Sequence, residues 1–271
     1  MEELARAKIN LALHVRGREP DGYHRLETVF AFAEHGDVLR VEPGAELTLT
    51  VEGPFAAGLS RGEDNLVLRA AGALQARFGV EEGAALILDK RLPVASGIGG
   101  GSADAAAALR LLDRFWGLEA GEAALLELAR PLGADVPACL LSRTCIGTGR
   151  GDALRPYESG LEGAPLLLVN PLVPVSTADV FRCWGGVDGG PLPEDLRSAR
   201  NDLQAPAIEV APVISDVLYA LDGLEGTTLV RMSGSGATCF ALFENEAACD
   251  AGAAAMRSAQ PSWWLLESRI G

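Results

Sequence analysis

The segment 93–106 combines closely spaced glycines with the start of a predicted helix. Four of the five positions 97–101 are glycine, and an alanine-rich run follows over 103–112. Glycine lets backbone N–H groups face a ligand without a Cβ clash, and a helix start adds unpaired N–H groups with partial positive charge. This combination predicts a cradle for the phosphates of a nucleotide or another polyphosphate. The residues expected to form it are Pro93, Val94, Ala95, Ser96, Gly97, Ile98, Gly99, Gly100, Gly101, Ser102 and Ala103.

Two common phosphate-binding motifs do not fit this segment. A P-loop needs a lysine after its glycines, and the dinucleotide-binding G-x-G-x-x-G motif fails at Ser102. A flexible loop is the alternative, but direct passage into a helix with a small-residue face favours the cradle. Ser102 can cap the helix, or it can contact a phosphate or Mg²⁺. The helix dipole explains Asp104 in the first turn better than a metal-binding role does.

Asp135 is the candidate for proton transfer. It lies in Leu132-Gly-Ala-Asp-Val-Pro137, where its carboxylate has apolar neighbours. Phosphoryl transfer needs a positioned hydroxyl nucleophile, and such a carboxylate can take the proton of an alcohol. A helix N-cap or a turn is an equally good explanation of this residue.

Lysine is rare in this chain. Of its 23 basic residues only Lys8 and Lys90 are lysines, and the others are arginines. Because an ammonium and a guanidinium are not interchangeable in a tight pocket, both lysines are candidate site residues. Lys8 can pair with the Asp135 carboxylate or stabilise a transferring phosphoryl group. The alternative for each lysine is that it was retained by chance. A second alternative for Lys8 is a surface position on an edge strand.

Two further motifs are candidates for ligand binding. Tyr23 and His24 follow an Asp-Gly turn, where an aromatic ring and an imidazole can stack on and hydrogen-bond to a base. A turn tyrosine that packs on the core is the commoner case. A second backbone anion nest is expected at Ser233, Gly234, Ser235 and Gly236, with a tight hairpin-like turn as the alternative.

The periodicity of the sequence predicts the elements that position these residues. Apolar alternation over 5–15 indicates a strand. Further strands are expected at 25–33, 37–42, 47–52, 84–88 and 165–170, and a strand–turn–strand unit at 228–243. Helices are expected at 65–78, 103–115, 121–132, 177–183, 202–222 and 245–257. Strands and helices mix without regular βαβ alternation, which favours an α+β fold. The turn-rich stretch 147–151 places the domain boundary after 157, giving domains 1–157 and 158–271.

Composition limits the classes of partner. A chain of 271 residues suffices for one large or two modest domains. The net charge of −14 makes nucleic-acid backbone and anionic membrane poor partners. Five cysteines without a C-x-x-C pair read as reduced, buried residues, and three scattered histidines make a zinc site unfavourable. No segment resembles a signal peptide or a membrane span, so a cytoplasmic location is expected.

The motifs, in their order along the chain, resemble the GHMP kinase superfamily. Its pattern is matched by the glycine loop, by Leu132-Gly-Ala-Asp-Val-Pro137, and by Ala7-Lys-Ile-Asn10, Asp21-Gly-Tyr-His24, Glu63-Asp-Asn-Leu66, Lys90-Arg-Leu-Pro93, Gly149-Arg-Gly151, Asn201-Asp-Leu203 and Met232-Ser-Gly-Ser-Gly-Ala237. Together, Asp-Gly-Tyr-His and Ala-Lys-Ile-Asn separate the chain from mevalonate and homoserine kinases. They resemble the branch that phosphorylates a cytidine-diphosphate-linked methylerythritol.

This resemblance implies a two-domain α+β fold with the active site in the cleft between the domains. It implies phosphoryl transfer from ATP, with Mg²⁺, to the tertiary 2-hydroxyl of that sugar alcohol in the non-mevalonate route to isoprenoids. Asp135 would be the general base and Lys8 its partner. Asn10 would help to hold the substrate near them, and Thr177 would lie near its methylerythritol end. Tyr23 and Phe181 would sandwich the cytosine, with His24 reading its polar edge. Asn65 would lie near the adenine, and Lys90 near the nucleotide. A monomer or weak dimer is expected.

The chain departs from the family pattern at a few positions. Ala95, Ser96 and Ala103 replace residues that are commonly glycine or serine, and Asp152 replaces a common glutamate. These differences concern the hydrogen bonds to the triphosphate. Two other functions remain alternatives: a GHMP kinase of the homoserine or mevalonate type, and a nucleotide-binding sensor without transfer activity. A sensor would need neither Lys8 nor Asp135.

Overall fold

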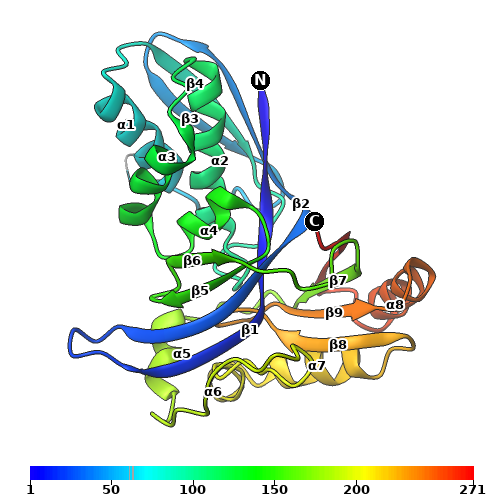
Figure 1. Cartoon of the computed structure of the whole chain (residues 1–271). Helices are drawn as coiled ribbons and strands as arrows, with labels where there is room; N and C mark the ends of the chain where they lie inside the picture. The colour runs from blue at the N-terminus through cyan, green and yellow to red at the C-terminus, as the bar shows by residue number, and fades with distance from the viewer. Residues whose placement is uncertain (61, 63) are drawn as a thin grey trace. The chain divides into compact units, whose positions relative to one another are not determined.

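The computed structural model describes residues 1–60, 62 and 64–271 and contains two compact units (Figure 1). Unit 1 consists of 1–7, 35–94 and 99–142, and unit 2 of 8–34, 95–98 and 143–271. The chain therefore passes between the units several times. The domain boundary after 157 stays a prediction. Glu63 of the Glu-Asp-Asn-Leu motif lies outside the described residues.

The two long strands β1 (Glu2–Arg18) and β2 (His24–Gly44) contribute residues to both units. The sequence predicted two strands, 25–33 and 37–42, where the structure has the single strand β2. The exposed pair Glu34 and His35 breaks the alternation without ending the strand. Gly36 allows a close approach to β1, because a Cβ there would lie 1.9 Å from the carbonyl oxygen of Ala5.

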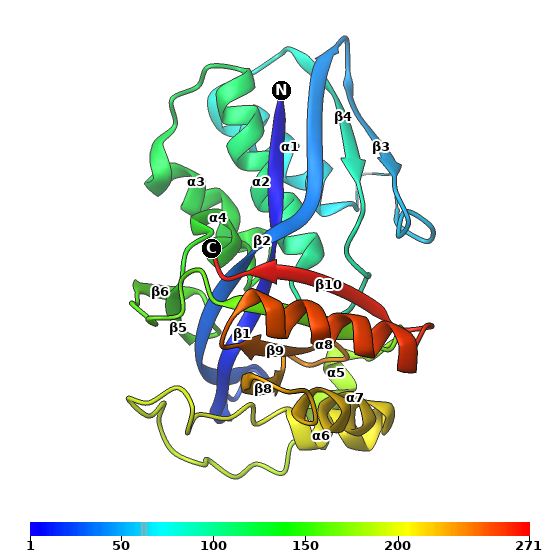
Figure 2. The same cartoon turned by 90° about the vertical axis from the view of Figure 1, so that its right-hand side faces the viewer.

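Unit 1 packs helices against a small sheet. β3 (Leu47–Glu52) runs parallel to β4 (Gly83–Asp89), which pairs antiparallel with 38–44 of β2. The helices are α1 (Leu66–Phe78), α2 (Gly100–Phe115), α3 (Gly121–Ala129) and α4 (Val136–Leu141), with a 3₁₀ turn at Arg130–Leu132. Figure 2 shows α1, α2 and α3 grouped on one side of β3 and β4. The predicted helix 121–132 thus ends in a 3₁₀ turn, and α4 was not predicted.

Helix α2 is the centre of unit 1. Alanine has the highest helix propensity, and its small side chain lets neighbouring helices approach closely. Accordingly α1, α3 and α4 all pack against α2, and its residues from Ala103 to Leu109 are buried. The helix begins at Gly100, three residues before the predicted start, with Gly99 as N-cap in the left-handed region (φ 65°).

Unit 2 contains an antiparallel four-stranded sheet with the strand order β10-β7-β9-β8. Its strands are β7 (Pro165–Asn170), β8 (Thr227–Met232), β9 (Cys239–Phe243) and β10 (Trp264–Arg269). Helices α7 (Val213–Asp222) and α8 (Glu246–Ala259) pack on this sheet. In Figure 2, α8 runs alongside β10. The sequence prediction missed β10.

The rest of unit 2 contains two short strands that extend the sheet from β2 and two short helices. β5 (Cys145–Gly149) pairs with 26–30 of β2 and with β6 (Ala153–Pro156). The stretch 147–151, predicted as turns alone, therefore includes the end of a strand. Helix α5 (Thr177–Cys183) was predicted with the same bounds. The predicted helix 202–222 is two helices, α6 (Gln204–Val210) and α7, because Pro212 lacks the N–H that would continue the first.

Arg231 is a buried cation that the sequence analysis did not identify. It is 6% exposed, and its guanidinium donates to the carbonyl oxygens of Leu11, Leu196 and Ala199. Burial lowers the pKa of Arg231 to about 10. Its bonds tie β8 to the unit 2 part of β1 and to the loop before α6.

The cysteines match the expectation of reduced residues. All five are free thiols, but only four are buried, because Cys183 at the end of α5 is exposed. Burial raises the pKa of Cys145 to about 11. In the described part of the chain no helix is both long enough and apolar enough to cross a bilayer.

Candidate active site

A network of buried polar side chains in unit 2 begins at Lys8. The Nζ of Lys8, 3% exposed, donates to Oδ1 of Asn10 at 2.9 Å and lies 5.3 Å from the centre of the Phe30 ring. The side-chain Nδ2 of Asn10 donates to the Thr28 hydroxyl at 2.8 Å. This hydroxyl in turn donates to the carbonyl of Ala12 at 2.7 Å. Lys8 is thus not an edge-strand surface lysine. Its ammonium is held in one place, as a group that acts on a ligand must be.

The same network reaches the glycine loop. The N–H of Asn10 donates to the Ser233 hydroxyl at 3.2 Å, and this hydroxyl donates to the carbonyl of Gly97 at 2.9 Å. Gly97 has φ 79°, and a Cβ there would lie 2.5 Å from the carbonyl oxygen of Ser233. Glycine is therefore required at 97 by the protein's own backbone packing. The structure brings together Asn10, Gly97 and Ser233, which the sequence analysis had identified separately.

The segment 233–236 is the turn between β8 and β9, and all four residues are buried. The N–H of Gly236 bonds to the carbonyl of Ser233 at 3.0 Å, which is the hairpin-like turn that the sequence left open. Asn201 holds the turn by donating to the carbonyls of Met232 and Gly234, both at 2.8 Å. Anion binding here stays a prediction, supported by the N–H groups of Gly234 and Ser235, which have no acceptor in the described chain.

The first turn of α2 belongs to the segment predicted to form the phosphate cradle. Gly99 caps α2 without a side-chain hydrogen bond. The first paired N–H is that of Ala103, which bonds to the carbonyl of Gly99 at 2.8 Å. Within the described residues the N–H groups of Gly100, Gly101 and Ser102 have no acceptor. Three such donors at a helix start are typical of anion-binding sites. Binding of the phosphates of ATP at this turn stays a prediction.

Lys90 lies just after β4 in unit 1, within a buried ion-pair cluster. Its Nζ donates to Asp37 at 2.6 Å and to Asp104 at 2.6 Å, and its side chain is 2% exposed. Burial lowers the pKa of Lys90, but the two carboxylates more than offset this and raise it above its ordinary value. The ammonium therefore persists at neutral pH, where it already has two anionic partners. Asp104, which the sequence explained by the helix dipole, is one of them.

Asp135 occupies the N-cap position of α4, but its side chain makes no capping hydrogen bond there. Its carboxylate is half-buried, at the end of a 3₁₀ turn and before the apolar helix α4. The geometry therefore weakens the N-cap explanation that the sequence left open. The role of general base stays a prediction.

Arg150 covers one face of the Tyr23 ring. The Arg150 guanidinium lies 3.7 Å from the centre of the Tyr23 ring and pairs with Asp21 at 2.6 Å. Asp21 also accepts the N–H of Tyr23 at 3.1 Å. Tyr23 is 55% exposed, so it does not pack on the core. The role of Arg150 was not predicted, because only the tertiary structure brings it to this turn.

His24, Phe181 and Trp184 form an aromatic cluster. The centres of the His24 and Phe181 rings are 4.6 Å apart, and Trp184 meets His24 edge-on at 5.5 Å. Burial, then the charge of Arg18, lower the pKa of His24, so a neutral imidazole is present at pH 7. The sequence analysis missed Trp184, although its three-residue spacing from Phe181 is typical of neighbours on one helical face.

The remaining predicted residues have clear local partners. Thr177 begins α5, and its hydroxyl lies 2.8 Å from that of Ser235. Asn65 is the N-cap of α1, where its side chain accepts the N–H of Val67 at 2.9 Å. Pro93, Ser96 and Ile98 are buried, whereas Val94 and Ala95 are exposed. Contact of Thr177 with the sugar alcohol and of Asn65 with adenine stays a prediction.

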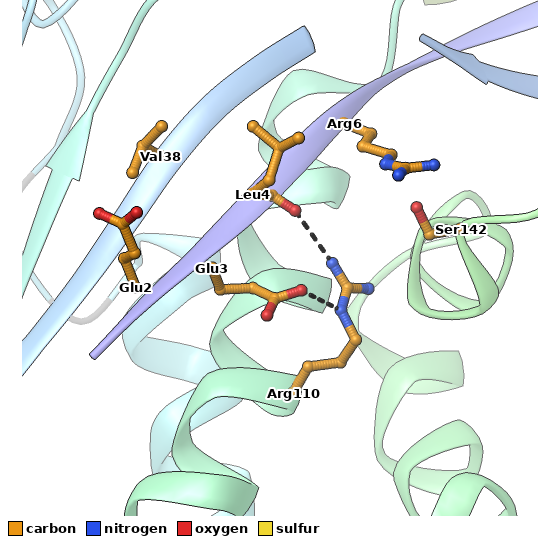
Figure 3. A pocket seen from close by; sticks show the side chains of 7 residues that line it. All are labelled: Glu2, Glu3, Leu4, Arg6, Val38, Arg110 and Ser142. Atoms are coloured by element: carbon orange, nitrogen blue, oxygen red, sulfur yellow. Dashed lines mark hydrogen bonds and ion pairs between the residues drawn. The ribbon is translucent and has the colours of Figure 1, made fainter. Parts of the chain in front are cut away.

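One cavity of unit 1 lies apart from all these residues. It has a volume of about 630 Å³ and is lined by Glu2, Glu3, Leu4, Arg6, Val38, Arg110 and Ser142. Figure 3 shows Arg110 bonded to Glu3 and to the carbonyl of Leu4. No predicted site residue lines the cavity. The Arg110 guanidinium there is bonded to Glu3 and to the carbonyls of Leu4, Cys139 and Leu140.

Within the described residues there is no cluster of three or more histidine, cysteine, aspartate or glutamate side chains that could hold a metal ion. Mg²⁺ in kinases is usually bound through substrate phosphates with one or two carboxylates. An ion that arrives with ATP therefore needs no such cluster. The structure assigns no protein ligand to it.

Comparison with known proteins identifies the class. The family model "GHMP kinases N terminal domain" matches residues 65–143, and "GHMP kinases C terminal" matches 189–262. The chain is a GHMP kinase. It is 55% identical to the 4-diphosphocytidyl-2-C-methyl-D-erythritol kinase of Rhizorhabdus wittichii, across 99% of this chain and 94% of that protein. The enzyme of the same name from Sphingopyxis alaskensis is 51% identical across 100% and 98%. The chain belongs to the 4-diphosphocytidyl-2-C-methyl-D-erythritol kinase family.

Solved structures agree with this assignment. A crystal structure of 4-(cytidine 5'-diphospho)-2C-methyl-D-erythritol kinase matches with a TM-score of 0.85 and 36% identity, covering 100% of both chains. Homoserine kinase from Cytophaga hutchinsonii matches with a TM-score of 0.74 at 19% identity, covering 100% of this chain and 94% of that one. The second likeness concerns the fold alone. The α+β GHMP kinase fold predicted from the sequence is confirmed.

Proposed function

We propose that this chain transfers the γ-phosphoryl group of ATP to the 2-hydroxyl of 4-diphosphocytidyl-2-C-methyl-D-erythritol. The products are the 2-phosphate and ADP, and the step belongs to the non-mevalonate (MEP) pathway of isoprenoid biosynthesis. The observation that carries the proposal is the 55% identity over 99% of the chain to a kinase of that name. Further support comes from the unpaired N–H groups at the start of α2, the buried Lys8, the exposed ring of Tyr23 and the aromatic cluster of His24, Phe181 and Trp184.

The chemistry needs one proton acceptor and charge stabilisation. The substrate oxygen forms a bond to the γ-phosphorus, the bond to the β-phosphate oxygen breaks, and the hydroxyl proton passes to the Asp135 carboxylate. We assign to Lys8 the stabilisation of this carboxylate and of the transferring phosphoryl group. Its ammonium, held by Asn10 at 2.9 Å, is a fixed positive charge and needs no reorganisation during the reaction.

The phosphates of ATP are assigned to the glycine loop. The unpaired N–H groups of Gly100, Gly101 and Ser102 would receive them, with the positive end of α2 adding to the attraction. Mg²⁺ is proposed to accompany ATP and to neutralise charge on its phosphates. For Lys90, the buried pairing with Asp37 and Asp104 supports a position beneath this turn, near the nucleotide phosphates.

The cytosine is assigned to the exposed ring of Tyr23 and to Phe181, with His24 at its polar edge. Arg150 covers one side of the Tyr23 ring, so stacking would use the other side or displace the guanidinium. The neutral imidazole of His24 has one donor and one acceptor nitrogen, which suits the amino and carbonyl groups of cytosine. Asn10 and Thr177 are proposed to contact the rest of the substrate. We further propose a cytoplasmic enzyme that acts on small molecules and is a monomer or weak dimer.

Tyr23→Ala is expected to raise the KM for the cytidyl substrate by roughly fivefold to 100-fold, since base–aromatic stacking contributes about 1–3 kcal/mol. The KM for ATP should change far less. Steady-state kinetics with each substrate varied in turn measure both constants. Tyr219→Ala, which removes an 84% exposed ring on α7, is the matched control and should change neither. Equal increases in both constants for Tyr23→Ala would assign the ring a structural role.

The function itself is tested by ADP release from Mg-ATP with three acceptors: the cytidyl substrate, homoserine and mevalonate. Turnover with the cytidyl substrate alone is the expected result. Turnover with homoserine or mevalonate instead would agree with a GHMP kinase but would refute the proposed substrate. ATP binding without turnover on any of the three would favour a nucleotide sensor.

A further inference from the structure

The buried cluster of Asp37, Lys90 and Asp104 in unit 1 pairs two carboxylates with one ammonium. Asp37 comes from β2, Lys90 follows β4, and Asp104 lies in α2. Lys90 Nζ donates to one oxygen of each carboxylate at 2.6 Å, and the three side chains are 0–5% exposed. With both carboxylates ionised, the cluster carries a net charge of −1.

The two carboxylates are not equivalent. The second oxygen of Asp37 accepts the N–H groups of Arg91 at 2.6 Å and Leu92 at 2.8 Å. The second oxygen of Asp104, Oδ1, is buried and has no hydrogen-bond partner in the described chain. An unpartnered buried carboxylate oxygen is costly when charged and much less so when protonated. If the cluster takes up a proton, Asp104 is therefore the residue that receives it.

The cluster lies directly against the proposed phosphate cradle. A Cβ on Gly100 would lie 3.0 Å from Lys90 Nζ and 3.8 Å from Asp37 Oδ2. The unpaired N–H groups of the α2 first turn belong to Gly100 and its two successors. Buried charges are weakly screened at such short range, so an excess negative charge here opposes the binding of an anion to these groups.

The surroundings of Asp104 favour a proton near neutral pH. The pKa of Asp104 is raised to about 7. Burial raises it most, the Lys90 ammonium opposes this, and the Asp37 carboxylate raises it further. The helices packed against α2 present mainly apolar residues to the interior. Their buried residues are Val67, Ala70, Ala71 and Leu74 of α1, Leu125 and Ala129 of α3, and Val136, Pro137, Ala138, Cys139 and Leu140 of α4. Cys139 is the single titratable group among them.

We propose that Asp104 is a positioning residue that takes up a proton when nucleotide phosphates bind at the first turn of α2. Protonation removes the excess negative charge of the cluster while Lys90 keeps its ion pair with Asp37. Nucleotide affinity then rises as the pH falls through neutrality. This inference rests on the proposed function, because it requires that the ligand of the α2 first turn is a nucleotide phosphate.

Isothermal titration calorimetry with Mg-ADP tests the proposal, using wild type, Asp104→Asn and the exposed-acid control Glu81→Gln. Titrations at about pH 6 and about pH 8.5 lie on either side of neutrality. Wild type and the control should bind Mg-ADP at least about fivefold more tightly at the lower pH, as expected for the removal of one partly screened charge. Asp104→Asn should show a much smaller change. The titration of the nucleotide itself is the same for all three proteins and cancels in the comparison.

Proton uptake gives a second measurement that needs no variant. Wild type is titrated at about pH 7.5 in two buffers of different ionisation enthalpy, where a substantial fraction of one proton should be taken up per nucleotide bound. No uptake, or equal pH dependence in wild type and Asp104→Asn, overturns the proposal while nucleotide binding stands. If wild type neither binds Mg-ADP nor turns over, the proposed function fails instead.

Discussion

Asp135→Asn is expected to lower kcat by about 100-fold or more, the usual contribution of a general base. Asparagine keeps the shape of the side chain but cannot accept the proton of the substrate hydroxyl. The KM for ATP should remain close to that of wild type, because the assigned phosphate donors lie in the first turn of α2. Steady-state ADP release with the cytidyl substrate measures both constants.

Glu127→Gln is the matched control for this variant. It makes the same chemical change on an exposed carboxylate of α3, in the same unit, and should leave kcat unchanged. Asp135→Asn with near-wild-type turnover would remove the residue from the reaction. A fall in kcat together with loss of the folded structure by circular dichroism would point to a structural role at the start of α4.

The features that sequence alone predicted correctly depend on local physics. The glycine loop and α2 follow from residues adjacent in the chain. Helix α5 was predicted with its observed bounds, and in the structure Ser176 caps it. The family was also accessible, since the order of its motifs is a property of the sequence. The break between α6 and α7 had a visible signal in Pro212, which the apolar periodicity of the two flanking helices obscured.

The errors came from contacts between distant residues. In the sequence alone, Gly36 is typical of the end of a strand. In the structure a glycine is needed there because Ala5 of β1 lies against it. Asp37 is 53 residues from Lys90, and Asn10 is 223 residues from Ser233, so no local pattern reveals either pair. The rarity of lysine did mark Lys8 and Lys90 as special. The physical reason for Lys90 is its buried pairing with two carboxylates, which the composition did not reveal.

Lys90→Met is expected to reduce the free energy of unfolding of the protein by about 3–5 kcal/mol, the usual cost of removing one partner from a buried ion pair. Methionine is similar in length to lysine but leaves Asp37 and Asp104 buried without a cation. Denaturant unfolding followed by circular dichroism measures this free energy, because the fluorescence of the chain combines four tryptophans from the two units. Arg91→Met is the control at the neighbouring position. Arg91 pairs with Asp89, but its side chain is exposed, so the free energy of unfolding should fall by less than about 1 kcal/mol.

The effect of pH separates a lost charge pair from lost packing. A carboxyl group with a raised pKa destabilises the folded state increasingly as the pH rises from its unfolded value toward its folded one. In wild type Lys90 limits this penalty for Asp104, whose pKa is about 7. Without the ammonium the penalty grows, so the deficit of Lys90→Met should be larger at about pH 8 than at about pH 6. Adding Asp104→Asn should recover part of it, because one buried charge is then absent. A deficit that is independent of pH and unaffected by Asp104→Asn would mean that Lys90 contributes through packing alone.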